Sequence, residues 1–97
     1  MSRGRVDTNH GEIVRQLRVV PGVSVFDLSQ MGHGCSDIVV GWREKNWLFE
    51  IKRPKARKKL SPAQRRFRDS WTGQYGVIEK AAEALLVMGL LREKDAR

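Results

Sequence analysis

Three charged residues lie in or beside apolar segments of the sequence, where charged side chains are unusual. Asp37 opens the apolar run 38–42, whereas Glu50 and Lys52 fall in and after the apolar run 47–51. Burying a charge without a partner is costly. Two carboxylates that converge can hold a hard cation such as Mg²⁺, and a lysine beside them adds positive charge at a phosphate. The three residues therefore predict a metal-dependent phosphodiester site.

The spacing of these residues predicts that they share one face of a β-hairpin. Both apolar runs have the pattern of short strands, and residues 44–46 between them favour a turn. If Trp42 lies opposite Trp47, Lys52 lies opposite Asp37, and the Glu50 backbone lies roughly 7–8 Å from Asp37 on a diagonal. The alternative is a charged pair and a separate aspartate on a half-exposed hairpin.

The positive charge of the sequence is concentrated in one segment. Residues 43–68 hold 11 of the 19 Lys and Arg but two of the 11 Asp and Glu, so the net charge of +8 arises there. Lysines and arginines that neutralise phosphates bind nucleic acid without reading its sequence. A solvated surface segment is the plainer interpretation. We expect phosphate contacts from Arg53, Lys55, Arg57, Lys58, Lys59, Arg65 and Arg66.

Length and composition narrow the class of protein. A chain of 97 residues fits one domain, 1–97. One cysteine and two histidines cannot supply the four ligands of a structural zinc site. There is no apolar run of membrane-spanning length, no signal-peptide pattern and no nucleotide-binding glycine loop, so we expect a cytoplasmic protein that uses neither a membrane nor a nucleotide cofactor.

The remaining elements follow from local signals. A helix is expected from Thr8 or Asn9, either of which suits a cap, to about residue 20, then a strand over 23–28. Ser61 and Gln64 form a capping box that begins a second helix. A fourth strand over 75–78 and a last helix over 79–91 complete the order α-β-β-β-α-β-α. Residues 1–8 resemble a flexible basic arm, and 92–97 a frayed tail.

Three motifs in order carry a resemblance to a known family. They are GCSDIVVG at 34–41, WLFEIK at 47–52 and LSPAQ at 60–64. Together they resemble the PD-(D/E)xK nuclease superfamily, and most closely its small stand-alone VRR-NUC branch from bacteriophages, which is similar to Holliday-junction resolvases. The resemblance covers roughly residues 9–86. It implies an α/β, restriction-endonuclease-like core with a mixed central sheet.

The resemblance also implies a role for each matching residue. Asp37 and Glu50 would bind Mg²⁺, with Mn²⁺ able to substitute, and the Ile51 carbonyl would add a further ligand. Lys52 would orient or help deprotonate the attacking water. The remaining matches are Glu12, which fits an acidic ligand in the first helix, and Gln64, which fits a glutamine near the site. Ser36 replaces the usual proline before the aspartate, which affects strand stiffness rather than ligation.

The residues predict a metal-dependent phosphodiester site, and the resemblance implies an endodeoxyribonuclease that acts on branched DNA in a bacterial or phage-infected cell. A DNA-binding module without catalysis, using the same basic face, is the principal alternative, and an RNA-binding protein is a weaker one. Residues 81–91 are apolar almost all round, which predicts a homodimer contact or a central core helix. Two sites related by a two-fold axis would suit a symmetric four-way junction. His10 is expected at the surface near the first cap.

Overall fold

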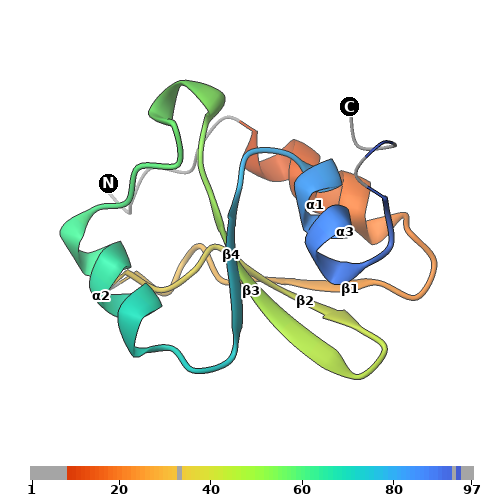
Figure 1. Cartoon of the computed structure of the whole chain (residues 1–97), viewed down its shortest axis with the longest axis horizontal. Helices are drawn as coiled ribbons and strands as arrows, with labels where there is room; N and C mark the ends of the chain where they lie inside the picture. Colours follow the sequence, from red (N-terminus) through yellow and green to blue (C-terminus); the bar gives the residue numbers. More distant parts are fainter. Residues whose placement is uncertain (1–8, 33, 93, 95–97) are drawn as a thin grey trace.

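The computed structural model describes residues 9–32, 34–92 and 94, and the predicted element order is confirmed in it. The basic arm 1–8 lies outside the described residues, as does most of the tail. The elements along the chain (Figure 1) are α1 (His10–Arg18), β1 (Ser24–Asp27), β2 (Ile38–Trp42), β3 (Lys45–Ile51), the 3₁₀ turn η1 (Pro54–Ala56), α2 (Pro62–Ser70), β4 (Gln74–Ile78) and α3 (Ala81–Met88).

The four strands form one mixed sheet in the order β1-β2-β3-β4. The first three strands run antiparallel to their neighbours, and β4 runs parallel to β3. A parallel pair needs a crossover, and η1 and α2 supply it. Figure 1 shows α2 on one side of the sheet and both α1 and α3 on the other. The fold is therefore a mixed α/β sheet covered on both faces.

The main core lies between the sheet and the pair α1 and α3. The apolar stripe of α1 recurs at helical spacing and is buried, as the sequence predicts. Trp47 and Phe49 stack with ring centroids 6.3 Å apart on this side of β3. Because side chains alternate along a strand, Glu50 and Lys52 face the opposite side, toward α2. The buried core residues are Ile13, Val14, Leu17, Ile38, Val40, Phe49, Ile51, Ile78, Ala81, Ala84 and Met88.

The hairpin turn lies one residue earlier in the chain than the sequence predicts, so the predicted register was wrong. Trp42 pairs with Lys45, not with Trp47, across a two-residue turn at Arg43 and Glu44. Both turn residues have positive φ, 52° and 66°. Such turns match the twist of the flanking strands, although glycine or asparagine usually fills them. The register differs by two residues, an even number, so Val39 still shares a face with Glu50.

Two predicted helices are shorter in the structure. α1 ends at Arg18 rather than near residue 20, and α3 covers Ala81–Met88 rather than 79–91. Gly89, with φ of 92°, closes α3, and the Leu90 N–H donates to the Leu85 carbonyl at 2.8 Å. This bond pattern ends a helix and leaves the last apolar residues in a turn. Within the described part of the chain, every helix is too short or too polar to cross a membrane.

Candidate functional site

Asp37 directly precedes β2, and its carboxylate hydrogen-bonds to the main chain of β3. Its own N–H donates to the Phe49 carbonyl at 3.0 Å, although Phe49 is the register partner of Ile38. Two residues of one strand thus face one residue of the other, which is a β-bulge. The Asp37 carboxylate accepts the Ile51 N–H through Oδ2 at 2.7 Å. The bulge therefore brings one predicted ligand next to the main chain of another.

Glu50 is a buried carboxylate on β3, one residue before Ile51. The residue is 3% exposed. Its Oε2 accepts a hydrogen bond from Gln64 Nε2 at 2.8 Å, and Oε1 is also buried. A carboxylate in such a place is stabilised by hydrogen bonds or by a cation. The burial marks Glu50 as a residue that the apolar core alone does not explain.

Gln64 connects Glu50 to Lys52. The Gln64 Oε1 accepts from Lys52 Nζ and from the Ser61 N–H, each at 2.8 Å, while Ser61 Oγ accepts the Gln64 N–H at 3.2 Å. The last two bonds are the predicted capping box, which is confirmed. One side chain therefore both begins α2 and holds the carboxylate and the ammonium of the candidate site.

The loop before Asp37 packs directly on the first turn of α2. Gly34 has φ of 79°, and a Cβ there would lie 2.5 Å from the Ala63 carbonyl oxygen. Only glycine suits both this backbone conformation and this contact. The close approach fixes the loop that leads to Asp37 against the helix that carries Gln64.

Asn9 is a site-supporting residue that the sequence did not reveal. Its Nδ2 donates to the Lys52 carbonyl at 3.1 Å and to the Glu79 carbonyl at 2.8 Å. These carbonyls end the parallel pair β3 and β4. An asparagine before a helix indicates a cap, and its partners here are distant in sequence, so no local signal pointed to this bridge. Asn9 fixes the main chain from which the Lys52 side chain extends.

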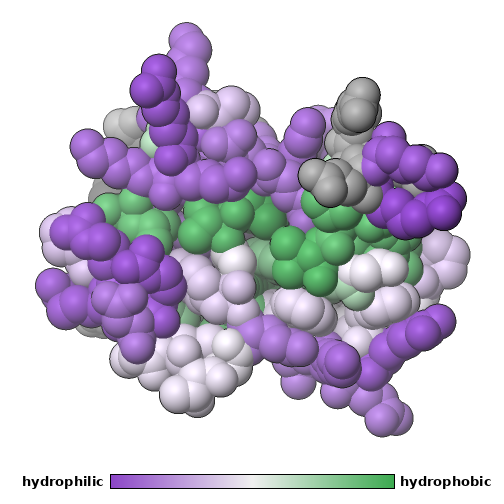
Figure 2. Space-filling model, viewed as in Figure 1, coloured by the Kyte–Doolittle hydropathy of each residue, from purple (hydrophilic) through white to green (hydrophobic). Residues whose placement is uncertain are grey.

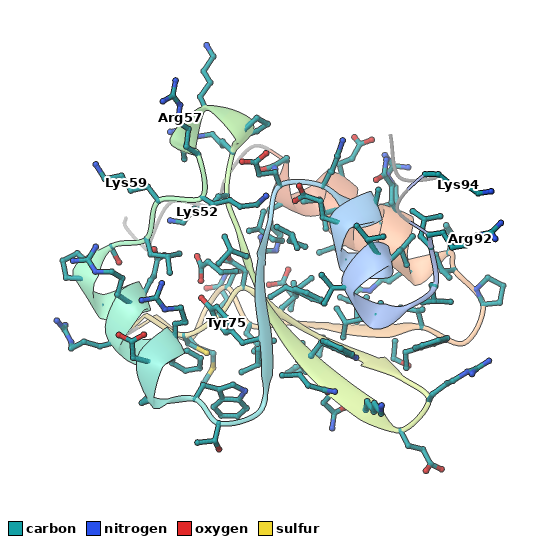
Figure 3. The ribbon with its side chains drawn as sticks, in the orientation of Figure 1. Lys52, Arg57, Lys59, Tyr75, Arg92 and Lys94 are labelled. Atoms are coloured by element: carbon teal, nitrogen blue, oxygen red, sulfur yellow. The ribbon has the colours of Figure 1, made fainter. Side chains whose placement is uncertain are left out.

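The two carboxylates affect their neighbours. Burial raises the pKa of Tyr75 to about 12, and the charge of Glu50 adds to the effect. Burial likewise raises the pKa of the Cys35 thiol, again with a contribution from Glu50. The Tyr75 side chain extends from β4 toward α2 (Figure 3). The negative potential that favours the neutral tyrosine and thiol is the potential that would attract a cation.

A groove lined by cations adjoins this cluster. It has a volume of about 880 Å³ and includes Lys52, so it reaches the candidate site. Figure 3 shows Arg57 and Lys59 on the side of the molecule away from Arg92 and Lys94, and Figure 2 shows hydrophilic side chains there above a hydrophobic patch. The described lining residues are Lys52, Lys55, Ala56, Arg57, Lys59, Leu60, Ser61, Pro62 and Arg65, five of them cationic and none acidic.

Several predicted site residues lie outside this group. Lys58 Nζ is held by Glu83 Oε2 at 3.1 Å rather than lining the groove. Arg53 and Arg66 are exposed and do not line it either. Glu12 is exposed on α1, where its carboxylate binds Gln16 at 2.8 Å and Arg15 at 3.3 Å. The structure brings together Asp37, Glu50, Ile51, Lys52 and Gln64 but not Glu12.

The expected surface position of His10 was wrong. His10 is 4% exposed, and its Nε2 lies 3.0 Å from Asp27 Oδ2 on the α1 side of the sheet. Burial by itself would raise the pKa of Asp27, but hydrogen bonds from Ser29 and His10 outweigh it, and the pKa is lowered. The carboxylate partner makes burial of the imidazole acceptable.

The donor atoms at the site suit a hard divalent cation. Within residues 9–32, 34–92 and 94, no three side chains of His, Cys, Asp or Glu form a metal-binding group. The predicted ligand set has two carboxylates, Asp37 and Glu50, and one main-chain oxygen, that of Ile51. All are oxygen donors, which Mg²⁺ prefers, and buried Glu50 supplies negative charge. The residues present therefore fit the implied ion.

Comparison of the chain with protein-family models, with curated proteins and with solved structures gives no match.

Proposed function

We propose that the chain is a Mg²⁺-dependent endonuclease with a restriction-endonuclease-like fold that hydrolyses phosphodiester bonds in DNA. The observation that carries this proposal is the Gln64 bridge between Glu50 and Lys52, formed where Asp37 meets Ile51. Removing the Glu50 carboxylate and the Lys52 ammonium from water costs free energy, so stability alone does not explain an amide that holds both groups in place. The mixed sheet and its element order agree with the fold that the motifs imply.

The residues have distinct tasks in this proposal. Asp37, Glu50 and the Ile51 carbonyl would hold the ion, which makes bound water more acidic and offsets charge on the phosphate. Lys52, oriented by Gln64, directs the attacking water and places a positive charge beside the phosphate. The oxygen of that water forms the new bond to phosphorus, and the departing sugar oxygen takes up a proton.

The groove supports nucleic acid as the substrate. Lys55, Arg57, Lys59 and Arg65 surround the space that leads to Lys52, so a phosphate backbone lying there reaches the site. Branched DNA and a homodimer with two sites remain part of the proposal, because a symmetric junction needs one site for each strand.

The test is cleavage of four-way, flap, single-stranded and plain duplex DNA, each with Mg²⁺, with Mn²⁺ and with EDTA. Asp37→Asn, Glu50→Gln and Lys52→Met should abolish cutting and retain DNA binding. Asp69→Asn is the matched control, since Asp69 is an exposed acid of α2, and it should cut normally. Binding without cutting by the unaltered chain would instead support the non-catalytic DNA-binding module.

A further inference from the structure

An exposed aromatic side chain lies on the sheet face that carries the candidate site. Phe26 of β1 is 67% exposed. On the same face, α2 covers β3 and β4. Gln64 contacts Glu50, and the ring centroids of Phe67 and Tyr75 lie 6.4 Å apart. Beside Phe26 lies a hollow of about 340 Å³, lined by Ser24, Val25, Phe26, Val39, Gly41 and Asn46.

The strand register places this hollow along the same sheet face as the carboxylates, from Val39 to Gly41 and Asn46, which lie four residues from Asp37 and Glu50. Phe26 pairs with Val39, and Val39 is two residues from Asp37 on β2. Asn46 stands four residues before Glu50 on β3, an even number, so the two share a face. Two residues of a strand span roughly 6.8 Å. That distance is similar to the spacing of neighbouring phosphates in an extended nucleic-acid strand.

The chemistry of the hollow suits a nucleobase better than a phosphate. The described residues around it carry no charge, so nothing there would neutralise an anion. The Phe26 ring offers a surface for stacking, and Gly41 adds no side chain to the hollow. The Asn46 amide and the Ser24 hydroxyl can hydrogen-bond a base edge. Phosphates have the cationic groove instead.

We infer that the hollow binds one unpaired nucleobase, stacked on Phe26, of the DNA strand whose phosphate lies at Asp37 and Glu50. This inference rests on the proposed function and names its substrate class: DNA with an unpaired nucleotide beside the cut. A base inside a duplex is stacked on its neighbours and cannot offer its face to Phe26. The basic groove supplies the charge that brings the strand to this sheet face.

The experiment measures binding with Mg²⁺ in the Lys52→Met background, so that a cation can hold the phosphate at the carboxylates while no cutting occurs. The probe is a single-stranded oligonucleotide with one 2-aminopurine, whose fluorescence falls when the base stacks, and a plain duplex serves for comparison. Phe26→Ala should remove the quenching and weaken single-strand binding roughly 5- to 150-fold, the range for loss of one stacked base. Duplex binding should stay the same. Phe26→Tyr should retain both the quenching and the single-strand affinity, whereas Phe26→Leu should lose both.

Val19→Ala is the matched control, because Val19 is 75% exposed and does not line the hollow. It should bind like the Lys52→Met chain. Equal binding of single strands by the Phe26→Ala chain would overturn the inference. A dimer that Phe26→Ala converts to a monomer would also overturn it, by assigning the hollow to a second copy. If the unaltered chain cuts no DNA with Mg²⁺ but the Phe26 effect is present, the proposed nuclease activity fails and the base site does not.

Discussion

Gln64 Nε2 lies 2.8 Å from Glu50 Oε2, and this contact fixes the orientation of the Gln64 amide. Because the nitrogen faces Glu50, the oxygen must face Lys52, where it accepts a hydrogen bond at 2.8 Å. The same oxygen serves the Ser61 cap. A change at this side chain therefore affects the helix start and the candidate site in separable ways.

Gln64→Glu separates these two roles. Glutamate serves as well as glutamine in a capping box, so the start of α2 should be kept, while repulsion of the buried Glu50 should lower the melting temperature at neutral pH. A carboxylate beside Glu50 repels it and cannot donate a proton, so the cleavage rate should fall about 10- to 100-fold, as for other groups that orient metal ligands. Gln16→Glu, which places a similar charge beside Glu12 on α1, is the control for rate and melting temperature. An unchanged rate in the Gln64→Glu chain would contradict the assigned role.

Lys59→Ala and Lys58→Ala should differ in DNA binding. Lys59 lines the groove, whereas Lys58 is held by Glu83. Removing a phosphate contact lowers the slope of log affinity against log salt by roughly 0.9. We expect that decrease, with weaker binding to every sequence, for Lys59→Ala only. Titration of one duplex at several salt concentrations measures it, and equal slopes for the two variants would argue against the groove.

The titration of Tyr75 should report the charge of Glu50. The sequence has one tyrosine, so the phenolate absorbance belongs to Tyr75 alone. Its midpoint should lie near the raised pKa of about 12 rather than the usual value of about 10. Glu50→Gln should lower the midpoint without abolishing the shift, because burial is the larger cause.

The raised pKa of Tyr75 also makes the unfolding free energy depend on pH. Between pH 10 and 12 the unfolded chain binds fewer protons at Tyr75 than the folded chain does, so the unfolding free energy should fall as the pH rises. Tyr75→Phe should remove that part of the slope in denaturant melts. A phenol that titrates near 10 in the folded chain would disprove both expectations.

Val87→Glu tests the homodimer. Figure 2 shows hydrophobic surface over α3, and Val87 is 49% exposed there. Such a patch favours contact with a second copy. Light scattering should give twice the chain mass for the unaltered protein and a single mass for Val87→Glu. Because Leu86 and Leu90 are half-buried, their replacement by glutamate would disturb folding as well. A monomer at micromolar concentration in the unaltered protein would rule the dimer out.

Local signals explain which features the sequence predicts correctly. The Ser61–Gln64 capping box and the two-residue spacing that puts Glu50 and Lys52 on one face each depend on residues close together in the chain. The hairpin register failed because Arg43 and Glu44 adopt positive φ without glycine, which composition does not signal.

Distant partners explain what the sequence does not reveal. His10 is buried beside Asp27 of another element, whose carboxylate accepts a hydrogen bond from it, and the Asn9 side chain bridges two strand ends instead of capping its own helix. The groove requires the η1 turn to lie beside α2, a tertiary relationship without a local pattern. The sequence shows the cation-rich segment. It does not show that Lys58 pairs with Glu83 while Lys59 lines the groove.

The two-residue turn at Arg43 and Glu44 also orders the assembly of the site in time. A short loop costs little entropy to close, and a hairpin forms in about 1–10 μs, so β2 and β3 are the pair expected to form early. Asp37 and Glu50 are brought to the same end of the sheet in that step. The parallel partner β4 can dock only after the chain has passed through α2. The carboxylates are therefore expected to meet before Gln64 and β4 join them.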